Sequence, residues 1–349
     1  MSDGRLVFLS LAPGVWGAER SMLTLAQSLL GLGEELLLIC TDEGLANEWQ
    51  RITHAPVEVV AIPGGSRRAV VRRFFGQVTP RTSRTDTLVI FSYVLAAGTL
   101  GRFSWPHGRP RVVIDLHDTL TRHKGRLALS LASIRAHRVV AVSKFTAQQL
   151  HRPLRNKVRV LTRPVSPISF DPPDLQSASI RVGVIGRIHP QKNAALLIRA
   201  AEELPDVRVV VRGDVAADDS DYARSLQELG SSRLGTRFVI ESARPWRYAL
   251  DDLDVLLVAN SSEPMGRTVL EAQLRGVTVV VPDSGGSTEL VADGVTGFVY
   301  HADDAQSLAR VLGRLRETDV MGMREAARME AKRATDPVAY ATNYLGVIR

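Results

Sequence analysis

The stretch NSSEPMGRTVLEAQLRGVTVVVPDSGG, residues 260–286, contains the alternation on which the fold rests. Its central part predicts a helix of about 265–275, because Pro264 suits a first helical turn and Gly276 is a natural C-terminal stop. The apolar run VTVVVPD, residues 277–283, predicts a strand that is buried on both faces. A helix followed directly by such a strand is typical of a parallel sheet covered by helices.

The same alternation runs through both halves of the chain and predicts an α/β fold with two Rossmann-like domains. Between the halves lies LTRPVSPISFDPPD, residues 161–174, whose four prolines predict a linker without regular structure. A first helix is expected from residue 17 to residue 31 or 33, where glycines can end it. The predicted strands are 5–11, 35–40, 57–62, 87–92, 111–116 and 138–143 in the first half, and 180–187, 207–213, 237–242, 254–260 and 277–283 in the second half.

Composition and charge restrict the class of protein. The chain has 349 residues, of which 45% are hydrophobic and 23% are charged, an ordinary balance for soluble domains. Cys40 is the only cysteine, so an intrachain disulfide is excluded, and no apolar stretch approaches the roughly 20 residues that span a bilayer. The apolar run at the N-terminus is too short for a signal peptide. We therefore expect a cytoplasmic protein.

The net charge of +7 is unevenly distributed along the chain. Residues 1–175 carry a net charge of +10, whereas residues 176–349 carry −3. The sequence has no recognisable nucleic-acid-binding motif and few aromatic residues to stack on bases, so we do not expect nucleic acid as a partner. An anionic membrane surface or an acidic acceptor suits the basic half better.

Two glutamates flank the start of the helix in the opening stretch. Its first amides, about 266–269, lack partners within the helix and favour an anion such as phosphate. Glu263, before the helix, can accept hydrogen bonds from hydroxyl groups of a ligand. Glu271 has apolar neighbours and needs a partner. The alternative is a structural ladder of Arg267, Glu271 and Arg275 at i±4 spacing on a solvated face.

Two other corners between a strand and a helix carry candidate ligand-binding groups. In GRIHPQK, Arg187 is expected to end a strand and Lys192 to begin a helix, and the two cations suit a diphosphate. The alternative is a pair of solvated surface cations. In PDSGGSTEL, Gly285 and Gly286 allow either close approach of a ligand or a purely structural turn, and Glu289 follows them.

The first half offers weaker signals. Gly17 opens the first helix within GVWG, which is G-x-x-G and lacks the glycine pattern of dinucleotide-binding loops. His117 and Asp118 follow the predicted strand 111–116, where a ligand-contacting side chain would lie. A lone histidine is more often structural than catalytic, so both interpretations stay open.

Taken together, these motifs resemble those of the retaining glycosyltransferases of family 4, which have the GT-B fold and include bacterial mannosyl- and glucosyltransferases. The motifs are EPMGRTVLE (an E-x7-E pattern), GRIHPQK, GGSTELVADGVTGFV and, less specifically, GAERSM. The resemblance implies two Rossmann-like domains with parallel sheets that face a central cleft. The expected domains are an acceptor-binding domain of 1–165 and a nucleotide-sugar-binding domain of 166–337, with a C-terminal helix of about 338–349 packing back on the first.

The resemblance also implies roles for individual residues. Glu263 would bind hydroxyls of the donor hexose, Glu271 the ribose of the nucleotide, and His117 the transferring sugar. Arg187 and Lys192 would hold the diphosphate. The segment FVIESARPW, with Glu241, falls where such enzymes contact the base. The expected nucleotide-sugar-binding set is completed by Gly17, Met265, Gly266, Arg267, Thr268 and Val269. Neither a cofactor nor a metal ion is expected.

The implied reaction transfers a hexosyl group from a UDP- or GDP-sugar to a hydroxyl of a glycan, lipid-linked or secondary-metabolite acceptor. A nucleotide-sugar epimerase of the same fold and a non-catalytic nucleotide-sugar-binding protein remain alternatives. The segment SRRAVVRRFFGQV, residues 66–78, combines four arginines with Phe74 and Phe75, which suggests peripheral contact with an anionic membrane. An ordinary basic surface helix fits the same residues.

Overall fold

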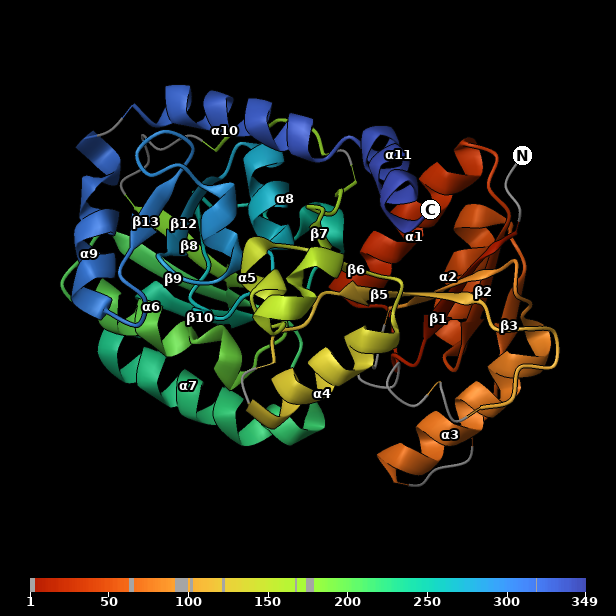
Figure 1. Cartoon of the computed structure of the whole chain (residues 1–349). Coiled ribbons are helices and arrows are strands. Elements are labelled where there is room, and N and C mark those ends of the chain that lie inside the picture. The colour runs from red at the N-terminus through yellow and green to blue at the C-terminus, as the bar shows by residue number, and fades with distance from the viewer. Residues whose placement is uncertain are drawn as a thin grey trace. The chain divides into compact units, whose positions relative to one another are not determined.

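The computed structural model describes residues 4–62, 66–91, 100, 103–120, 123–166, 168–173, 179–317 and 319–349. The chain folds as two compact units (Figure 1). Unit 1 comprises Met1–Val165 with Thr335–Arg349, and unit 2 comprises Ser166–Ala334. Each unit is an α/β structure with its own parallel sheet and its own apolar cores.

The described part of unit 1 contains a seven-stranded parallel sheet in the order β3-β2-β1-β4-β5-β6-β7. Its strands are almost continuous apolar runs, as expected for a sheet that is covered on both faces. The order reverses between β1 and β4, which is where open parallel sheets bind ligands beyond their carboxyl ends. The strands are β1 (Leu6–Ser10), β2 (Leu36–Cys40), β3 (Val57–Val59), β4 (Thr87–Ile90), β5 (Arg111–Leu116), β6 (Arg138–Ala141) and β7 (Val158–Val160).

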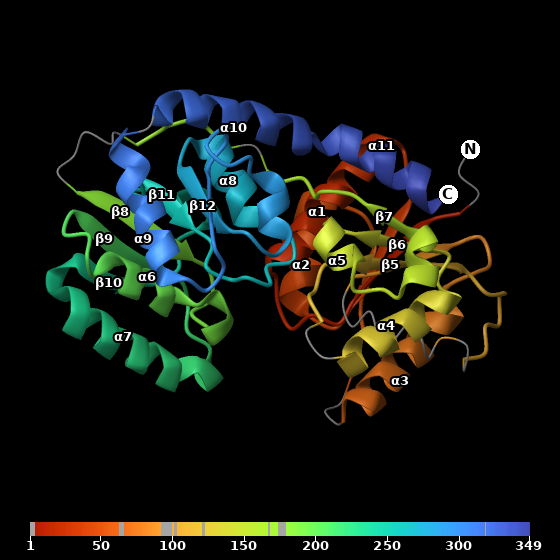
Figure 2. The same ribbon diagram turned by 60° about the vertical axis from the view of Figure 1, so that its left-hand side comes forward.

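Helices cover both faces of this sheet (Figure 2). One face packs on α1 (Gly17–Gly31), α2 (Glu43–Thr53) and the C-terminal α11 (Pro337–Ile348). The other face packs on α3 (Arg67–Val78), α4 (His123–Arg135) and the short α5 (Lys144–Ala147). The last helix of the chain therefore completes the apolar core of the first unit.

In unit 2 the described strands form a six-stranded parallel sheet in the order β10-β9-β8-β11-β12-β13. Its order reverses between β8 and β11, which pair in parallel with Val182 of β8 opposite Val255 of β11. The strands are β8 (Ile180–Ile185), β9 (Val207–Arg212), β10 (Phe238–Glu241), β11 (Val255–Leu257), β12 (Thr278–Pro282) and β13 (Phe298–Tyr300).

The two faces of the second sheet are covered differently. One face packs on α6 (Ala194–Ala201), α7 (Ser220–Leu234) and α9 (Ala305–Gly313). The other packs on α8 (Arg267–Arg275) and on Leu250 and Leu253, which belong to an irregular crossover from β10 to β11. The remaining helix, α10 (Val320–Ala334), packs against α8.

The structure corrects several predicted boundaries. The helix of the opening stretch begins at Arg267 rather than at 265, because Gly266 adopts a left-handed conformation with φ +92° and serves as its N-cap. Pro264 therefore lies before the helix and not in its first turn. Lys192 does not begin a helix: it ends a 3₁₀ turn, and Asn193, with φ +48°, separates it from α6.

The predicted linker contains the boundary between the two units, and its described residues form no helix or strand, but both of its ends are packed against the units. Arg163 is buried within unit 1, and Phe170 packs against Arg328 of unit 2, with the guanidinium carbon 4.4 Å from the ring centroid. Pro167 and Asp174 lie outside the described residues. The short strands β7 and β13 were not predicted, since a run of three residues is too short to show a recognisable period.

Candidate functional site

Two loops of unit 2 leave neighbouring strands at the point where the strand order reverses. One follows β8 and runs from Gly186 to Lys192, and the other follows β11 and runs from Asn260 to Gly266. Because β8 and β11 are adjacent and parallel, both loops emerge at the same edge of the sheet. The topology thus brings together two motifs that are about seventy residues apart in the sequence.

Glu263 lies at the centre of this site. One carboxylate oxygen, Oε2, accepts hydrogen bonds from Lys192 Nζ at 3.0 Å and from Asn260 Nδ2 at 3.0 Å. The backbone of Glu263 is held as well, since its carbonyl accepts a 2.7 Å bond from the Gly286 amide. The side chains of Lys192 and Glu263 are 32% and 17% exposed, so the ion pair is within reach of solvent and of a ligand. We call Lys192, Asn260 and Glu263 the Glu263 cluster.

The N-terminus of α8 lies directly after this cluster in the chain. An added Cβ at Gly266 would lie 3.0 Å from Ser287 Cβ, and the φ of +92° is strained for any other residue, so a larger side chain is disfavoured here. The first amides of a helix have no partner four residues back, although here the Val269 amide donates to the Gly266 carbonyl at 2.9 Å. The anion site expected from residues 266–269 is therefore reduced to the amides that precede Val269. The side chains of Met265 and Val269 are buried, while Thr268 is half-buried.

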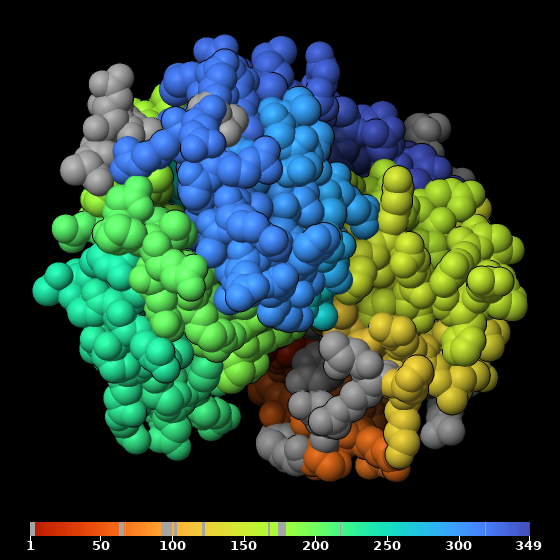
Figure 3. All heavy atoms as spheres, turned by 90° about the vertical axis from the view of Figure 1, so that its left-hand side faces the viewer, coloured from red at the N-terminus to blue at the C-terminus, as the bar shows by residue number. Residues whose placement is uncertain are grey.

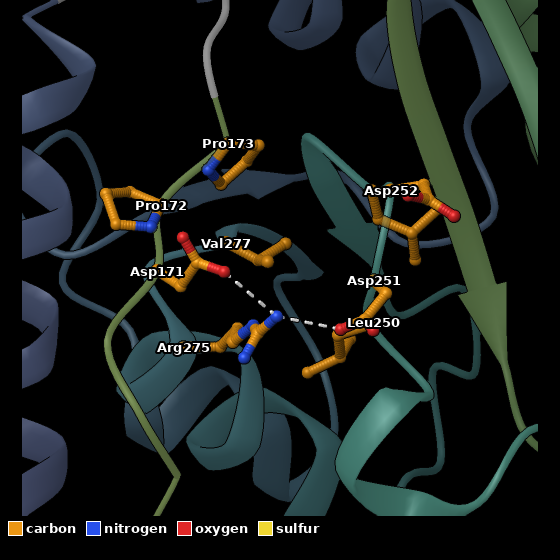
Figure 4. A pocket seen from close by; sticks show the side chains of 9 residues that line it. Asp171, Pro172, Pro173, Leu250, Asp251, Asp252, Arg275 and Val277 are labelled. Carbon is orange, nitrogen blue, oxygen red and sulfur yellow. Dashed lines mark hydrogen bonds and ion pairs between the residues drawn. The ribbon is translucent and has the colours of Figure 1, made fainter.

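Glu271 has the partner that its apolar surroundings require. Its Oε1 accepts a 2.8 Å hydrogen bond from Arg267 Nε, and the two side chains are only 13% and 14% exposed. Half of the alternative ladder is thus present, but on a largely buried face. Arg275 does not extend it, because its guanidinium pairs with Asp251 at 2.8 Å and with Asp171 at 3.2 Å (Figure 4).

Those pairs line a separate cavity of about 360 Å³ at the other end of α8. Figure 4 shows Arg275 between Asp171 and Asp251, with Pro172 and Pro173 beside them. The contact fastens the segment that enters unit 2 to the end of α8. We assign this cavity a structural role.

Ser287 is a residue of the site that sequence reasoning missed. It lies in the 3₁₀ turn Gly286–Leu290, is fully buried, and its hydroxyl has no hydrogen-bond partner among the described residues. Buried polar groups are normally paired, and Ser287 Cβ lies against Gly266, so this hydroxyl is a candidate ligand-contacting group. Only its place after the two glycines could have indicated it. Arg187 follows Gly186 in the neighbouring loop and is exposed.

Glu241 lies in a network of arginines within unit 2. Its carboxylate binds Arg212 Nε at 2.8 Å and Arg244 Nη2 at 3.0 Å, and Arg181 Nη2 is 3.8 Å away. Arg244 also hydrogen-bonds Asp252, which lowers the pKa of that carboxyl group. These contacts hold the crossover from β10 to β11 against the sheet, so Glu241 has a structural role whether or not it also contacts a nucleotide base.

In unit 1, His117 follows β5 and is 11% exposed. Its Nδ1 lies 3.4 Å from Arg163 Nη2, and its ring packs against Phe91 with the centroids 5.9 Å apart. Arg163 in turn forms a fully buried ion pair with Asp115, whose other oxygen accepts a 3.2 Å hydrogen bond from the Tyr344 hydroxyl. Burial raises the pKa of Tyr344 well above its ordinary value. We call these residues the His117 cluster.

Gly17 is the first residue of α1, as expected. Before it, the Trp16 amide donates to Glu19 Oε2 at 3.2 Å, while the Trp16 indole is 54% exposed. Among the described residues, no group of three or more histidine, cysteine, aspartate or glutamate side chains is arranged to hold a metal ion. No helix in the described ranges is long and apolar enough to cross a bilayer.

Two family models match nearly the whole chain between them. The model for Glycosyl transferases group 1 matches residues 167–334, and the model for Glycosyltransferase Family 4 matches residues 15–167. The chain belongs to the family 4 glycosyltransferases, whose second half the group 1 model describes. The two matches meet within two residues of the boundary between unit 1 and unit 2.

The chain is similar to curated relatives over about half of its length. The D-inositol 3-phosphate glycosyltransferase of Mycobacterium sp. (strain KMS) is 32% identical over 209 residues, which are 55% of this chain and 47% of the relative. That of Mycolicibacterium smegmatis is 31% identical over 199 residues, 51% of this chain and 46% of the relative. The match thus spans about half the length of these relatives.

Solved structures share the fold of this glycosyltransferase over its whole length. Anabaena HepE, solved with UDP and glucose, has a TM-score of 0.83 and 23% identity, with 98% of each chain covered. A glycosyltransferase from Rickettsia africae has a TM-score of 0.81 and 17% identity, with 100% of this chain and 98% of that chain covered. The fold is that of the GT-B glycosyltransferases.

Proposed function

We propose that this glycosyltransferase is a retaining hexosyltransferase whose donor, a UDP- or GDP-sugar, binds in unit 2. The Glu263 cluster is the observation that carries the proposal, because it places a carboxylate and a cation beside the N-terminus of α8. The names of the relatives, D-inositol 3-phosphate glycosyltransferase, support glycosyl transfer. The UDP and glucose in the structure of HepE support a nucleotide sugar as donor.

In this proposal the positive groups of unit 2 stabilise the leaving diphosphate. Lys192 and Arg187 supply full charges, and the first amides of α8 supply the positive end of a helix dipole. The unpaired hydroxyl of Ser287 can donate one further hydrogen bond to an anion next to Gly266. Because these groups neutralise the developing charge, the proposed mechanism uses no metal ion and no cofactor.

The two glutamates bind the two sugars of the donor. Lys192 and Asn260 both donate to Oε2 of Glu263. In the proposal the other oxygen, Oε1, accepts hydrogen bonds from hexose hydroxyls. Glu271 accepts hydrogen bonds from the ribose, and the hydrogen bond from Arg267 orients its carboxylate. His117 contacts the transferring sugar, and Gly17 leaves room at the start of α1. Glu241 shapes the segment that approaches the base.

The proposed reaction breaks the bond between the anomeric carbon and the diphosphate oxygen. The acceptor oxygen bonds to the same face of that carbon, and its proton passes to the departing diphosphate, so the configuration is retained. Positive charge develops on the sugar ring and negative charge on the leaving group in the transition state. The acceptor is a hydroxyl compound, either a glycan, a lipid-linked molecule or a secondary metabolite.

A thermal-shift panel of UDP, GDP, ADP and TDP tests the donor part of this proposal. A nucleotide at about one hundred times its dissociation constant stabilises the protein by roughly 2.7 kcal/mol. The stabilisation should disappear in Glu271→Gln and persist in the matched control Glu325→Gln, whose side chain is exposed on α10. If all four nucleotides leave the melting temperature unchanged, the donor assignment is wrong.

Analysis of the products separates transfer from the alternatives. A transferase releases a nucleoside diphosphate in proportion to the glycosylated acceptor formed. A nucleotide-sugar epimerase of the same fold would convert the donor to a new nucleotide sugar without any acceptor. A non-catalytic binding protein would show the thermal shift with no turnover.

A further inference from the structure

The charge of unit 1 is concentrated in one stretch of the chain. Residues 119–170 contain eleven lysines and arginines and no aspartate or glutamate. The rest of the first 175 residues is close to neutral, so this stretch accounts for the whole positive excess of that half. It includes α4, α5 and β7, and most of it lies on one side of the sheet of unit 1.

Within this stretch, α4 is apolar on both of its faces. Leu129 and Ala132 are fully buried in the core of unit 1. On the opposite face, Leu127, Leu131 and Ile134 are 53%, 54% and 56% exposed. Their spacing of four and three residues places them in one row along the helix. Large apolar side chains arranged in this way are expensive to leave in water, which indicates that something covers them.

Cations surround this row. Lys124 and Arg135 are exposed near the two ends of α4. The 3₁₀ helix Arg152–Lys157 lies beside α4, because Lys157 Nζ donates to the carbonyls of Ile134 at 2.8 Å and Ala136 at 3.0 Å. This bond uses Lys157 structurally and leaves the exposed Arg152 and Arg155 next to α4.

A pocket of about 260 Å³ separates α4 from the segment that leads into this 3₁₀ helix. Arg155 donates to the carbonyls of Leu150 at 3.2 Å and Gln148 at 3.1 Å, which orients its guanidinium at the rim. None of the described residues that line the pocket is an aspartate or glutamate, so its chemistry suits the phosphate of an anionic headgroup. The lining residues are His123, Arg126, Gln148, Gln149, Leu150, His151, Arg152 and Arg155.

We propose that the α4 face, defined as Leu127, Leu131 and Ile134 with the basic pocket beside them, docks on the surface of an anionic phospholipid bilayer. Apolar side chains that enter the headgroup region, surrounded by arginine and lysine and free of acids, are the pattern of an interfacial helix. In Figure 3, α4 and the segments that follow it in the chain are coloured yellow to yellow-green. The occupant is lipid rather than a second protein because both the charge and the apolar row are complementary to it.

The same structure corrects the membrane prediction for residues 66–78. Phe74 and Phe75 of α3 are each 1% exposed and belong to the core of unit 1, so they are not available to a membrane. The side chain of Arg67 lies outside the described residues. A row of apolar side chains reaches solvent on α4 instead, which is the next helix along the chain on this face of the sheet.

Co-sedimentation of the full chain with vesicles tests the proposal. We expect binding to vesicles that contain phosphatidylglycerol, weaker binding at high salt, and none to pure phosphatidylcholine. The variant Leu127→Gln/Leu131→Gln/Ile134→Gln should lose binding roughly tenfold or more. Arg152→Gln/Arg155→Gln should weaken binding and reduce its dependence on salt.

A matched control carries the same chemical change elsewhere. The variant Val295→Gln/Met321→Gln/Met329→Gln replaces three apolar residues of unit 2 that are 57%, 47% and 54% exposed, and it should bind as the unchanged chain does. Both triple variants alter exposed side chains only, so thermal melts should confirm that they are folded.

A fluorescent label reports contact directly. Since Cys40 is buried, a Leu131→Cys variant can be labelled selectively with an environment-sensitive dye. Its emission should shift to the blue on anionic vesicles, whereas a label in Met329→Cys should not respond. The proposal is overturned if the unchanged chain fails to bind at low salt or if the α4 triple variant binds equally well. A third outcome also overturns the proposal: the unchanged chain and the control triple variant are dimers, whereas the α4 triple variant is a monomer. The α4 face would then contact a second copy of the chain.

Discussion

The Glu263 cluster and the His117 cluster each contain an ion pair, but water reaches the two pairs to different extents. Lys192 and Glu263 are 32% and 17% exposed, whereas Arg163 and Asp115 are 4% and 0% exposed. A partly exposed pair can exchange one partner for a ligand at little cost. A fully buried pair cannot, because either charge alone would be stranded in the core. The first pair is therefore suited to binding, and the second to holding His117 in position.

Breaking the buried pair should have the largest effect. Arg163→Ala leaves the Asp115 carboxylate in the core with only the Tyr344 hydroxyl as a partner, so we expect a loss of about 3–5 kcal/mol in the free energy of unfolding. Denaturant unfolding followed by circular dichroism measures it. Arg159→Ala, at an exposed arginine of the same unit, should change stability by less than about 0.5 kcal/mol. Equal stability of the two variants would contradict the assigned difference between the clusters.

Breaking the partly exposed ion pair between Lys192 and Glu263 should affect activity rather than folding. Lys192→Ala removes a cation from the proposed diphosphate site, and we expect kcat/KM for transfer to fall by about 100- to 1000-fold. The free energy of unfolding should change by less than about 1 kcal/mol, because Glu263 keeps its bond from Asn260. Lys332→Ala, at an exposed position of α10, is the control. Transfer within twofold of the unchanged enzyme would remove Lys192 from the site.

Gly266 extends the comparison from charge to shape. Gly266→Ala must accept φ +92° and place its Cβ 3.0 Å from that of Ser287, so we expect a loss of about 1–2 kcal/mol. It should also weaken binding of the nucleotide chosen by the thermal-shift panel. The matched change Gly346→Ala lies in α11, where an added Cβ meets nothing within 4 Å. That variant should be neutral or up to about 1 kcal/mol more stable, and a loss there similar to that of Gly266→Ala would refute the strain argument.

Tyr344 should give the smallest effect at neutral pH. Tyr344→Phe removes one hydrogen bond to Asp115, and we expect a loss of about 1 kcal/mol. At alkaline pH the effect has a defined sign. Because burial raises the pKa of Tyr344, the unfolded chain loses this proton at about pH 10 while the folded protein keeps it, so stability falls as the pH rises further.

The slope of the free energy of unfolding against pH in the alkaline range distinguishes Tyr344 from other tyrosines. Each such group contributes about 1.4 kcal/mol per pH unit, and Tyr344→Phe should remove one share. Tyr340, whose pKa burial raises to about 12, would still contribute in that variant. Stability measured by urea unfolding between neutral and strongly alkaline pH gives the slope, and Tyr248→Phe, at a 50% exposed position, is the control. An unchanged slope in Tyr344→Phe would show that this hydroxyl is not buried in solution.

The sequence predicted the fold class because buried parallel strands are mostly apolar runs. The predicted strand RVVIDL, for example, has the same first and last residues as β5 (Arg111–Leu116). It was less successful at element ends, where single backbone conformations decide. Gly266 and Asn193 adopt left-handed conformations that shorten α8 and separate Lys192 from α6. The sequence shows that a glycine can adopt such a conformation, but only the surrounding contacts require it.

Local patterns placed Glu263, Lys192 and His117 in the segments that follow strands, where parallel sheets bind ligands. They could not show that Lys192 and Glu263 form a hydrogen bond, since that contact depends on the adjacency of β8 and β11. The role of Arg163 was hidden by the prolines around it, which favoured a linker. Its partner Asp115 lies 48 residues away, and Tyr344 is farther still.

The sequence by itself determined the family, the two parallel sheets and the acid-free, basic composition of residues 119–170. Only the tertiary structure decided which side chains of the basic segments 66–78 and 119–170 face water. Phe74 and Phe75 lie in the core while Leu127, Leu131 and Ile134 lie on the surface. The physical reason is that composition fixes how much apolar and charged surface a helix carries, whereas packing against the sheet fixes which part of that surface is buried.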